Sequence, residues 1–340
     1  MAFWRNFFSS ASRDEFDVVG IGNAIVDVVS FVDDAKITEL RLEKGVMTLV
    51  DEHRAQEIYE SIGTAMEISG GSAANTVVGV ASLGGAAAYI GKIHEDAFGK
   101  IFSHDIRAAG VHYVTAPAST GKPTARSLIL VTPDAHRTMA TNLGISVEFS
   151  REDLSEKLIA QGKVTYLEGY LFDHPSAKTA FISAAEMAHK AGRKVALTLS
   201  DPFCVNRHKA EFQNLVHHHT DILFANEAEA LALTETRQFS DAVAALRGVC
   251  DYAAITRSEK GSVILHQDQT VEIAAIKVDK VIDTTGAGDL YAAGVLFGLT
   301  QGRSIAEMGH LGSIAAGHII TQAGARPARK LSEIVSKPRV

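Results

Sequence analysis

Short apolar runs recur along the second half of the chain and alternate with stretches that have helical spacing. The runs cover residues 164–167, 195–199, 222–225 and 253–256. Roughly thirty residues separate each run from the next, which is the length of a strand, a crossover helix and the return to a parallel strand. The pattern therefore predicts an α/β fold with a mostly parallel sheet that carries helices on both faces.

The first half of the chain begins with the same pattern. Residues 16–22 form an apolar run that ends in glycines, and a second apolar run covers 28–32. Residues 70–81 predict a helix of small residues, and residues 86–90 and 97–110 predict a further strand and helix. These elements belong to the same α/β domain, which we expect to span residues 16–330.

Two segments are richer in β-branched and turn residues than the rest of this domain. Residues 36–50 predict a strand pair at the surface. Further strands are predicted at 111–114, 127–131 and 137–141, with a turn at Pro133 and Asp134 before the last of them. We expect the two insertions, about 31–50 and 111–140, to pair into a small β-rich lid.

Composition places the chain among ordinary globular proteins. Of its 340 residues, 46% are hydrophobic and 21% are charged, and the formal net charge is -7 at pH 7. This charge gives no argument for a nucleic-acid partner, and no apolar run reaches the roughly 18 residues of a membrane span. Cys204 and Cys250 lack metal-ligand spacing, which predicts a reduced, cytoplasmic setting. Residues 1–15 are expected to be a flexible N-terminus.

The strongest chemical signal is the stretch 283–289, which reads Asp-Thr-Thr-Gly-Ala-Gly-Asp. Gly286, Ala287 and Gly288 would open a helix with bare N–H groups, and these amides together with the helix dipole form an anion site. Asp289 then lies in the first helical turn, where a carboxylate beside an anion can serve as a base for a substrate hydroxyl. A glycine-rich turn with an acid that favours the helix dipole is the structural alternative.

Polar residues near the predicted first strand and first helix could bind a hydroxylated ligand. Asp27 follows the first strand and can accept two hydrogen bonds from a vicinal diol, although an acid in a turn is equally ordinary. Gly70 and Gly71 would let a polar ligand approach the backbone, and Asn75 can both donate and accept. Close packing of the helix on the sheet is the alternative role for these small residues.

A further set of polar residues follows the later strands. Asn226 and Glu229 are three residues apart and suit a hydrated Mg²⁺, or else a capped helix N-terminus. Thr256 and Gly261 belong to a polar turn that lies near a nucleotide or simply closes a hairpin. Arg137, in the expected lid, is either a phosphate clamp or a surface arginine.

Other nucleotide-binding and hydrolase motifs are absent or incomplete in the sequence. The chain has no Gly-x4-Gly-Lys-Ser/Thr loop. Gly20 and Gly22 begin a dinucleotide fingerprint, but Ile25 occupies the position of the third glycine, so an oxidoreductase is a weak alternative. No Gly-x-Ser-x-Gly elbow occurs.

Taken together, these motifs resemble the ribokinase (PfkB) family of carbohydrate and nucleoside kinases, over about residues 16–330. The resemblance is carried, in chain order, by Gly70-Gly71-x-x-x-Asn75, Asn226-x-x-Glu229 and the stretch 283–289. It implies a ribokinase-like fold, ATP with Mg²⁺ as the phosphoryl donor, and a primary hydroxymethyl group on a small-molecule acceptor.

The resemblance also implies a role for each matching residue. Asp289 would be the catalytic base, with Gly286, Ala287 and Gly288 as the anion hole. The acceptor would contact Asp27, Gly70, Gly71 and Asn75, and the nucleotide would contact Arg137, Asn226, Thr256 and Gly261. Glu229 would hold Mg²⁺ through water, and Asp283, with carbonyl groups of residue 285 and of 323–325, is a candidate site for a monovalent cation such as K⁺.

Within the family, the chain most resembles adenosine kinases. Residues 132–144 are similar to their lid segment, residues 22–27 are similar to their opening strand, and Tyr170 would stack on the base. This favours phosphorylation of a nucleoside 5′-hydroxyl, adenosine to AMP. A sugar kinase acting on ribose, fructose or 2-keto-3-deoxygluconate is the alternative, followed by a non-catalytic binding protein. Monomer and homodimer both stay open.

Overall fold

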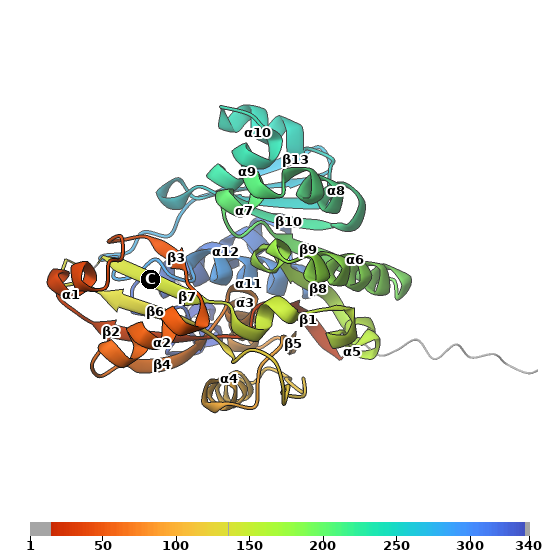
Figure 1. Ribbon diagram of the computed structural model, residues 1–340. Coiled ribbons are helices and arrows are strands. Elements are labelled where there is room, and N and C mark those ends of the chain that lie inside the picture. Colours follow the sequence, from red (N-terminus) through yellow and green to blue (C-terminus); the bar gives the residue numbers. More distant parts are fainter. Residues whose placement is uncertain (1–14, 135, 337–340) are drawn as a thin grey trace, which may run out of the picture.

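A computed structural model describes residues 15–134 and 136–336 of the chain (Figure 1). The expectation of a flexible N-terminus falls almost entirely on residues 1–14, which lie outside the described residues. In the part of the chain that is described, no helix is long and apolar enough to cross a membrane. Two β-sheets organise this part of the chain, and each has its own covering helices.

The larger sheet confirms the predicted parallel core. Its strand order is β13-β12-β11-β10-β9-β8-β1-β5, with parallel pairing from β5 to β11 and an antiparallel β12–β13 hairpin at the far edge. The strands are β1 (Phe16–Ile21), β5 (Ala87–Ile90), β8 (Gly162–Glu168), β9 (Lys194–Thr198), β10 (Ile222–Asn226), β11 (Tyr252–Thr256), β12 (Ser262–His266) and β13 (Gln269–Ile273).

Helices cover both faces of this sheet because side chains of a strand alternate between faces. Val19 and Ile21 of β1 join one buried cluster, whereas Val18 joins the other. The first cluster takes residues from α5 (Glu156–Gln161), α6 (Pro175–Lys190), α7 (Pro202–Arg207), α8 (Lys209–His219), α9 (Glu227–Thr234) and α10 (Phe239–Leu246). The second takes residues from α3 (Ser72–Ser82), α4 (Ala97–Ala108), α11 (Ala287–Thr300), α12 (Ile305–Ile319) and α13 (Leu331–Val335).

The smaller sheet has the order β3-β7-β6-β2-β4 and lies beside the main sheet, at the left of Figure 1. Its strands are β2 (Ile25–Phe31), β3 (Met47–Leu49), β4 (Met66–Gly70), β6 (Ala125–Val131) and β7 (Arg137–Asn142). Residues of α1 (Asp34–Glu39) and α2 (Glu52–Ser61) pack on one of its faces in a third buried cluster. Only residues 22–24 separate β1 of the main sheet from β2, so the chain passes directly from one sheet to the other.

Two of the predicted elements in this region were wrong. Residues 36–50 do not form a strand pair, because Asp33 caps a helix by accepting a hydrogen bond from Lys36 N–H and only β3 is extended. Residues 111–114 contribute an isolated bridge between Ala88 and His112 and no strand. The smaller sheet also takes β4 and, apart from Phe31, β2, which fall outside the expected insertions at 31–50 and 111–140. The predictions at 127–131 and 137–141 are confirmed by the β6–β7 pair.

Short 3₁₀ helices complete the connections: η1 (Gly144–Glu148), η2 (Arg151–Asp153), η3 (Gly169–Asp173) and η4 (Ser258–Lys260). Of these, η3 follows β8 directly, and η4 joins β11 to β12. Both therefore lie at the edge of the main sheet where its parallel strands end.

The close contact of α11 with α12 requires a glycine at residue 294. A Cβ atom there would lie 2.4 Å from the backbone nitrogen of Gly312 and 2.5 Å from the carbonyl carbon of Leu311. Because both neighbours are backbone atoms, a methyl group could enter only if the two helices moved apart.

We predict that Gly294→Ala lowers the free energy of unfolding by about 1–3 kcal/mol through overpacking. Helix propensity alone would favour alanine by about 1 kcal/mol, so a net loss isolates the steric effect. Denaturant unfolding measures it, with Gly63→Ala as the control, since a Cβ at Gly63 would meet nothing within 4 Å. Wild-type stability in the Gly294 variant would contradict the packing argument.

Candidate functional site

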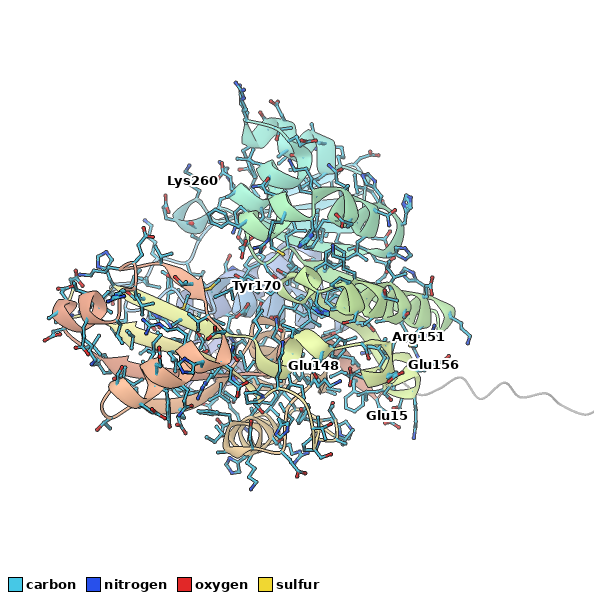
Figure 2. All side chains as sticks on the ribbon, in the orientation of Figure 1. Glu15, Glu148, Arg151, Glu156, Tyr170 and Lys260 are labelled. Carbon is cyan, nitrogen blue, oxygen red and sulfur yellow. The ribbon has the colours of Figure 1, made fainter. Side chains whose placement is uncertain are left out.

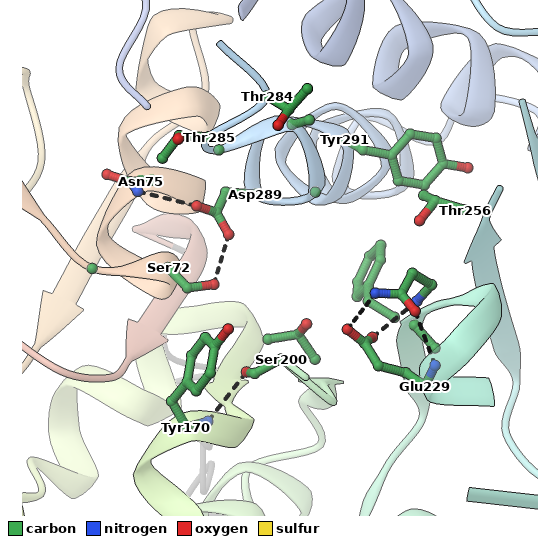
Figure 3. Close-up of a pocket in the computed structure, with 18 of the residues that line it drawn as sticks. Ser72, Asn75, Tyr170, Ser200, Glu229, Thr256, Thr284, Thr285, Asp289 and Tyr291 are labelled. Atoms are coloured by element: carbon green, nitrogen blue, oxygen red, sulfur yellow. Dashed lines mark hydrogen bonds between the residues drawn. The ribbon is translucent and has the colours of Figure 1, made fainter. Parts of the chain in front are cut away.

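A cavity of about 390 Å³ lies between the smaller sheet and the carboxyl ends of the parallel strands (Figure 3). Most of the residues singled out from the sequence line it: Asp27, Gly71, Asn75, Arg137, Tyr170, Asn226, Glu229, Thr256, Gly286, Ala287, Gly288 and Asp289. Three others, Gly70, Gly261 and Asp283, are not among the residues that line it. The site is where parallel α/β sheets place ligands, beyond the carboxyl ends of their strands.

Asp289 lies in the first turn of α11, and two side chains from α3 hold its carboxylate. Ser72 Oγ donates to one oxygen at 2.6 Å, and Asn75 Nδ2 donates to the other at 3.0 Å. Burial raises the pKa of Asp289 to about 6, and these two hydrogen bonds oppose the rise. The carboxylate is therefore fixed in orientation and mostly ionised at neutral pH, as a base for a hydroxyl group must be.

Helix α11 begins at Gly286, whose backbone is left-handed at φ 75°. A Cβ on Gly286 would lie 2.7 Å from Ala325 Cβ and 2.8 Å from its Cα, so this position has no room for a side chain. At Gly288 a Cβ would meet nothing within 4 Å, which shows open space beside the first turn. The Ala287 N–H donates to the Thr284 carbonyl at 3.2 Å, so an anion at this terminus would compete with that bond.

Asp27 extends from β2 toward the same cavity, and Gly70 provides the space for it. A Cβ on Gly70 would lie 2.4 Å from Asp27 Oδ2, because the two residues are on adjacent strands. Burial raises the pKa of Asp27 to about 6, and the charges of Arg137 and Arg326 oppose the rise. Gly70 therefore has a steric role, and its contact with the acceptor stays a prediction, while Asp27 is a carboxylate that faces the site.

Gly71 is the N-cap of α3 and also needs to be glycine. Its φ is 96°, and a Cβ would lie 2.3 Å from the Asn23 carbonyl oxygen. This conformation starts α3 at the cavity wall, which places Ser72 and Asn75 within reach of Asp289. The tight packing that was the alternative for this segment is confirmed at Gly71, and the binding of a ligand by Asn75 stays a prediction.

Glu229 and Asn226 form a capping box at the N-terminus of α9. Glu229 accepts from the Asn226 backbone N–H at 2.9 Å and from its Nδ2 at 2.6 Å, and Asn226 Oδ1 accepts from the Glu229 N–H. The capping alternative is therefore confirmed. Glu229 also lines the cavity, and burial raises its pKa to about 7. Such a carboxylate fits a Mg²⁺ ion that is bound mainly by phosphates and water, which needs only one or two protein oxygens.

Arg137 reaches from β7 of the smaller sheet to the loop before α11. Its Nη1 lies 2.7 Å from Asp283 Oδ1, so this ion pair joins the smaller sheet to the loop before α11. Asp283 also accepts from the Thr285 N–H at 2.9 Å, from Thr285 Oγ1 at 2.6 Å and from the Gly324 N–H at 2.9 Å. Burial opposes ionisation of Asp283, but these donors and Arg137 outweigh it and lower its pKa. A monovalent cation at this carboxylate would have to displace one of these donors.

Tyr170 follows β8 in η3 and lies near the junction of the two sheets (Figure 2). Its backbone N–H donates to Ser200 Oγ at 3.1 Å, and its ring lines the cavity below Asp289 in Figure 3. Ser200 is held at φ 71°, a conformation rare for residues other than glycine. The aromatic ring is thus anchored through its backbone and free to face a flat ligand.

Thr256 and Gly261 lie close together, because Thr256 pairs with Ser262 in the β11–β12 ladder and the Gly261 carbonyl accepts from the Arg257 N–H. Thr256 ends β11 and lines the cavity opposite Asp289. Gly261 has a φ of 86°, and a Cβ there would lie 2.0 Å from the Ile273 carbonyl, so its role is to shape the turn after η4. Gly261 is not among the residues that line the cavity, and its expected contact with the nucleotide stays a prediction.

Three residues at the site were not foreseen from the sequence. Ser72 bonds to Asp289, although it stands inside the same glycine-rich segment that drew attention to Asn75. Glu168, at the end of β8, accepts from Asn23 Nδ2 at 2.7 Å and from the Ala73 N–H at 2.8 Å, and burial raises its pKa to about 7. Arg326 donates to Asn75 from a loop near the C-terminus. In the sequence, Arg326 is a single arginine after Gly324 and Ala325, and nothing in this pattern indicates a role at the site.

The chain is similar to known proteins both in sequence and in structure. A family model described as pfkB family carbohydrate kinase matches residues 48–331. The structure is similar to that of adenosine kinase from Sinorhizobium meliloti, with 51% sequence identity, a TM-score of 0.88 and coverage of 94% of this chain and 98% of that chain.

Two other proteins show the breadth of the likeness. A probable sugar kinase protein from Rhizobium etli CFN 42 shares 49% identity at a TM-score of 0.89, with coverage of 95% of this chain and 98% of that chain. Adenosine kinase 2 from Arabidopsis thaliana is 24% identical over 92% of this chain and 97% of its own length.

The hydrogen bonds of Asp283 lead to a prediction about local stability. We predict that Asp283→Ala accelerates amide exchange at Thr285 and Gly324 at least tenfold, because hydrogen bonds to a charged acceptor contribute roughly 1.5–3 kcal/mol each. Hydrogen–deuterium exchange of peptides from these two segments measures it. Asp279→Ala, at an exposed position in the preceding loop, is the control and should leave both amides protected. Equal exchange in the two variants would show that Asp283 does not hold these segments.

Proposed function

The chain belongs to the pfkB family of carbohydrate kinases, and from this we propose that it transfers the γ-phosphoryl group of ATP to the 5′-hydroxyl of adenosine, giving AMP. As a member of this family it is a phosphotransferase with an alcohol group as acceptor. The preference for a nucleoside is supported by the 51% identity to an adenosine kinase.

One observation carries the proposal. The Asp289 carboxylate stands at the glycine-opened N-terminus of α11, and Asp27 lines the same cavity from the smaller sheet. A base beside an anion site, with a second carboxylate for ribose hydroxyls, is what phosphorylation of a primary hydroxyl requires. The arrangement supplies both parts from elements that belong to different sheets.

In the proposed reaction, the acceptor 5′-hydroxyl lies against Asp289. The carboxylate accepts the hydroxyl proton as the new P–O bond forms and the bond to the leaving ADP oxygen breaks. Ser72 and Asn75 hold the carboxylate so that its free lone pairs face the acceptor. The N-terminal amides of α11 stabilise the charge on the transferred group, because the helix dipole is positive at that end.

Residues of the smaller sheet would orient the acceptor and exclude water. Asp27 accepts hydrogen bonds from the ribose diol, while Ile129 and Met139 add apolar surface to the same wall of the cavity. We also propose that this sheet acts as a lid, and that Arg137 exchanges its partner Asp283 for nucleotide phosphate when the donor binds. Asn226 and Thr256 lie where the rest of the nucleotide would extend.

The family implies ATP and Mg²⁺ as the donor pair. Mg²⁺ would supply charge neutralisation on the phosphate oxygens, and Glu229 would contact it through water. Asp283, with the Thr285 carbonyl and those of 323–325, is retained as the proposed position for K⁺, although its oxygens already accept from Arg137, Thr285 and Gly324.

A sugar kinase is the second candidate, supported by the 49% identity to a probable sugar kinase. Asp27 and Asp289 would serve a free sugar equally well, since both contact hydroxyl groups. Tyr170 is the residue that separates the two, because a base has a flat face to stack on it and a free sugar does not. The cytoplasmic compartment stays a prediction from the sequence, and both a monomer and a homodimer stay open.

We predict that MgATP consumption is stimulated strongly by adenosine, in a panel with inosine, guanosine, cytidine, ribose, fructose and 2-keto-3-deoxygluconate. Asp289→Asn should lower kcat with adenosine by roughly 10²–10⁴ because it removes the base, while calorimetry still detects adenosine binding. ADP release measures turnover, and the variant shows that the signal arises at this site.

Each contrary outcome has a distinct meaning. Stimulation by a free sugar alone would keep the kinase chemistry and discard the nucleoside assignment. Near-normal turnover in the Asp289 variant would remove that residue as the base. Silence of the wild-type protein across the panel would favour a non-catalytic binding protein.

The two raised pKa values predict a steep acid limb in the rate profile. Both Asp27 and Asp289 have a pKa of about 6 and must be ionised, so kcat/KM for adenosine should fall as the pH drops below about 6. Because both groups must be deprotonated, kcat/KM should fall by more than one order of magnitude per pH unit. In Asp27→Asn, the slope should drop to that of a single group. An identical slope in the variant would exclude Asp27 from the titration.

A further inference from the structure

Arg326 places a cationic side chain beside the acceptor side of the site, in the loop between α12 and α13. Its Nε donates to Asn75 Oδ1 at 3.3 Å, and its Nη1 donates to Ser69 Oγ. Its Nη2 is shielded from solvent and has no hydrogen-bond partner among the described residues. Burial lowers the pKa of Arg326 to about 10, so the guanidinium stays charged at neutral pH.

Burying this guanidinium group costs free energy, so packing alone does not explain it. A buried polar group without a partner costs roughly 1–3 kcal/mol, and more when it carries charge. An apolar side chain would fill the same space without that cost. The position of Arg326, behind Asn75 and near Asp27, indicates what the charge contributes.

The contact with Asn75 determines which way its amide points. Because the amide oxygen accepts from Arg326, the amide nitrogen is turned toward Asp289 and donates to its carboxylate at 3.0 Å. The reverse orientation would face the amide oxygen against the carboxylate and the amide nitrogen against a guanidinium. Both contacts would then be repulsive.

Ser69 fixes the other end of the guanidinium. Ser69 lies on β4, and the Asp105 carboxylate of α4 accepts from its backbone N–H at 3.1 Å and from its hydroxyl at 3.2 Å. Arg326 therefore joins the C-terminal loop to a strand of the smaller sheet and to helix α3. It is held in place on both sides, unlike a mobile surface arginine.

The charge of Arg326 also acts on Asp27, because Arg326 bonds to Ser69 and the next residue, Gly70, packs against the Asp27 carboxylate. The charged groups that influence Asp27 are Arg137 from β7, Arg326 from the C-terminal loop, Asp289 from α11 and Asp283 from the loop before it. Arg137 is already paired with Asp283 and, in the proposed reaction, turns to phosphate. In that reaction Arg326, whose charge also faces Asp105, would remain beside Asp27.

We propose that Arg326 is a positioning residue of the acceptor site, which directs the Asn75 amide to the Asp289 carboxylate and supplies a fixed positive charge beside Asp27. The proposal rests on the kinase function proposed above and names a residue that tunes it. Arg326 acts through Asn75 and Asp27, and its effect should be visible in how activity depends on pH.

Two substitutions separate geometry from charge. Arg326→Met removes both, so the pH below which KM for adenosine rises should move upward by roughly one unit, and kcat should fall about tenfold at any pH where both carboxyls are ionised. Arg326→Lys keeps the charge but cannot reach Asn75 and Ser69 together, so its kcat should fall while its pH profile stays near wild type. Arg329→Met, three residues later and exposed, is the matched control and should change neither.

Thermal unfolding of each variant shows whether it is folded, and the Lys variant keeps the test available if the Met variant is not. A folded Arg326→Met protein whose pH profile and kcat match those of Arg329→Met would overturn the proposal.

A second readout does not depend on catalysis. The ¹³C resonance of the Asp27 carboxyl group, assigned by its loss in Asp27→Asn, should titrate at higher pH in Arg326→Met than in the wild-type protein. If adenosine is not phosphorylated, the proposed function fails, but this titration still decides the role of the charge. An unchanged midpoint would overturn that role whether or not the wild-type protein is a kinase.

Discussion

The site depends on how the Asp289 carboxylate is held, by one hydrogen bond from Ser72 and one from Asn75. Asp289 is in the first turn of α11, and its donors are in the first turns of α3. Two helix N-termini, both positive ends of their dipoles, therefore converge on a single carboxylate. This arrangement offsets part of the cost of burying the carboxylate and leaves its pKa at about 6, within the range that a base needs at neutral pH.

Glycines at both helix starts make the convergence possible. Gly71 begins α3 at φ 96° against the Asn23 carbonyl, and Gly286 begins α11 at φ 75° against Ala325. A side chain at either position would clash with these neighbours and displace the start of its helix. Because Ser72 Oγ lies only 2.6 Å from Asp289, even a small displacement would break that hydrogen bond.

The parts of the structure that were predictable from sequence are those governed by local pattern. The apolar runs located the parallel strands, and residues at their carboxyl ends, such as Thr256 and Asn226, lie at the cavity as expected. The topology of the smaller sheet was not predictable in this way. Strand β2 pairs with β6, about a hundred residues later in the chain, and with β4, which follows only after α1, β3 and α2. Arg326 escaped notice for the same reason, since its partners Ser69 and Asn75 are distant in sequence.

The balance of charge around the cavity favours a phosphoryl donor that carries its own cation. The carboxyl groups of Asp27, Asp289 and Glu229 line the cavity, and Asp283 lies just behind it. Against them stand two guanidinium groups, Arg137 and Arg326, and the first is already paired with Asp283. A nucleoside triphosphate adds several more negative charges to a region of low dielectric, where like charges repel strongly. A divalent cation bound to the phosphates would offset that repulsion. Burial raises the pKa of Glu229 to about 7, so a positive neighbour would favour its ionised form.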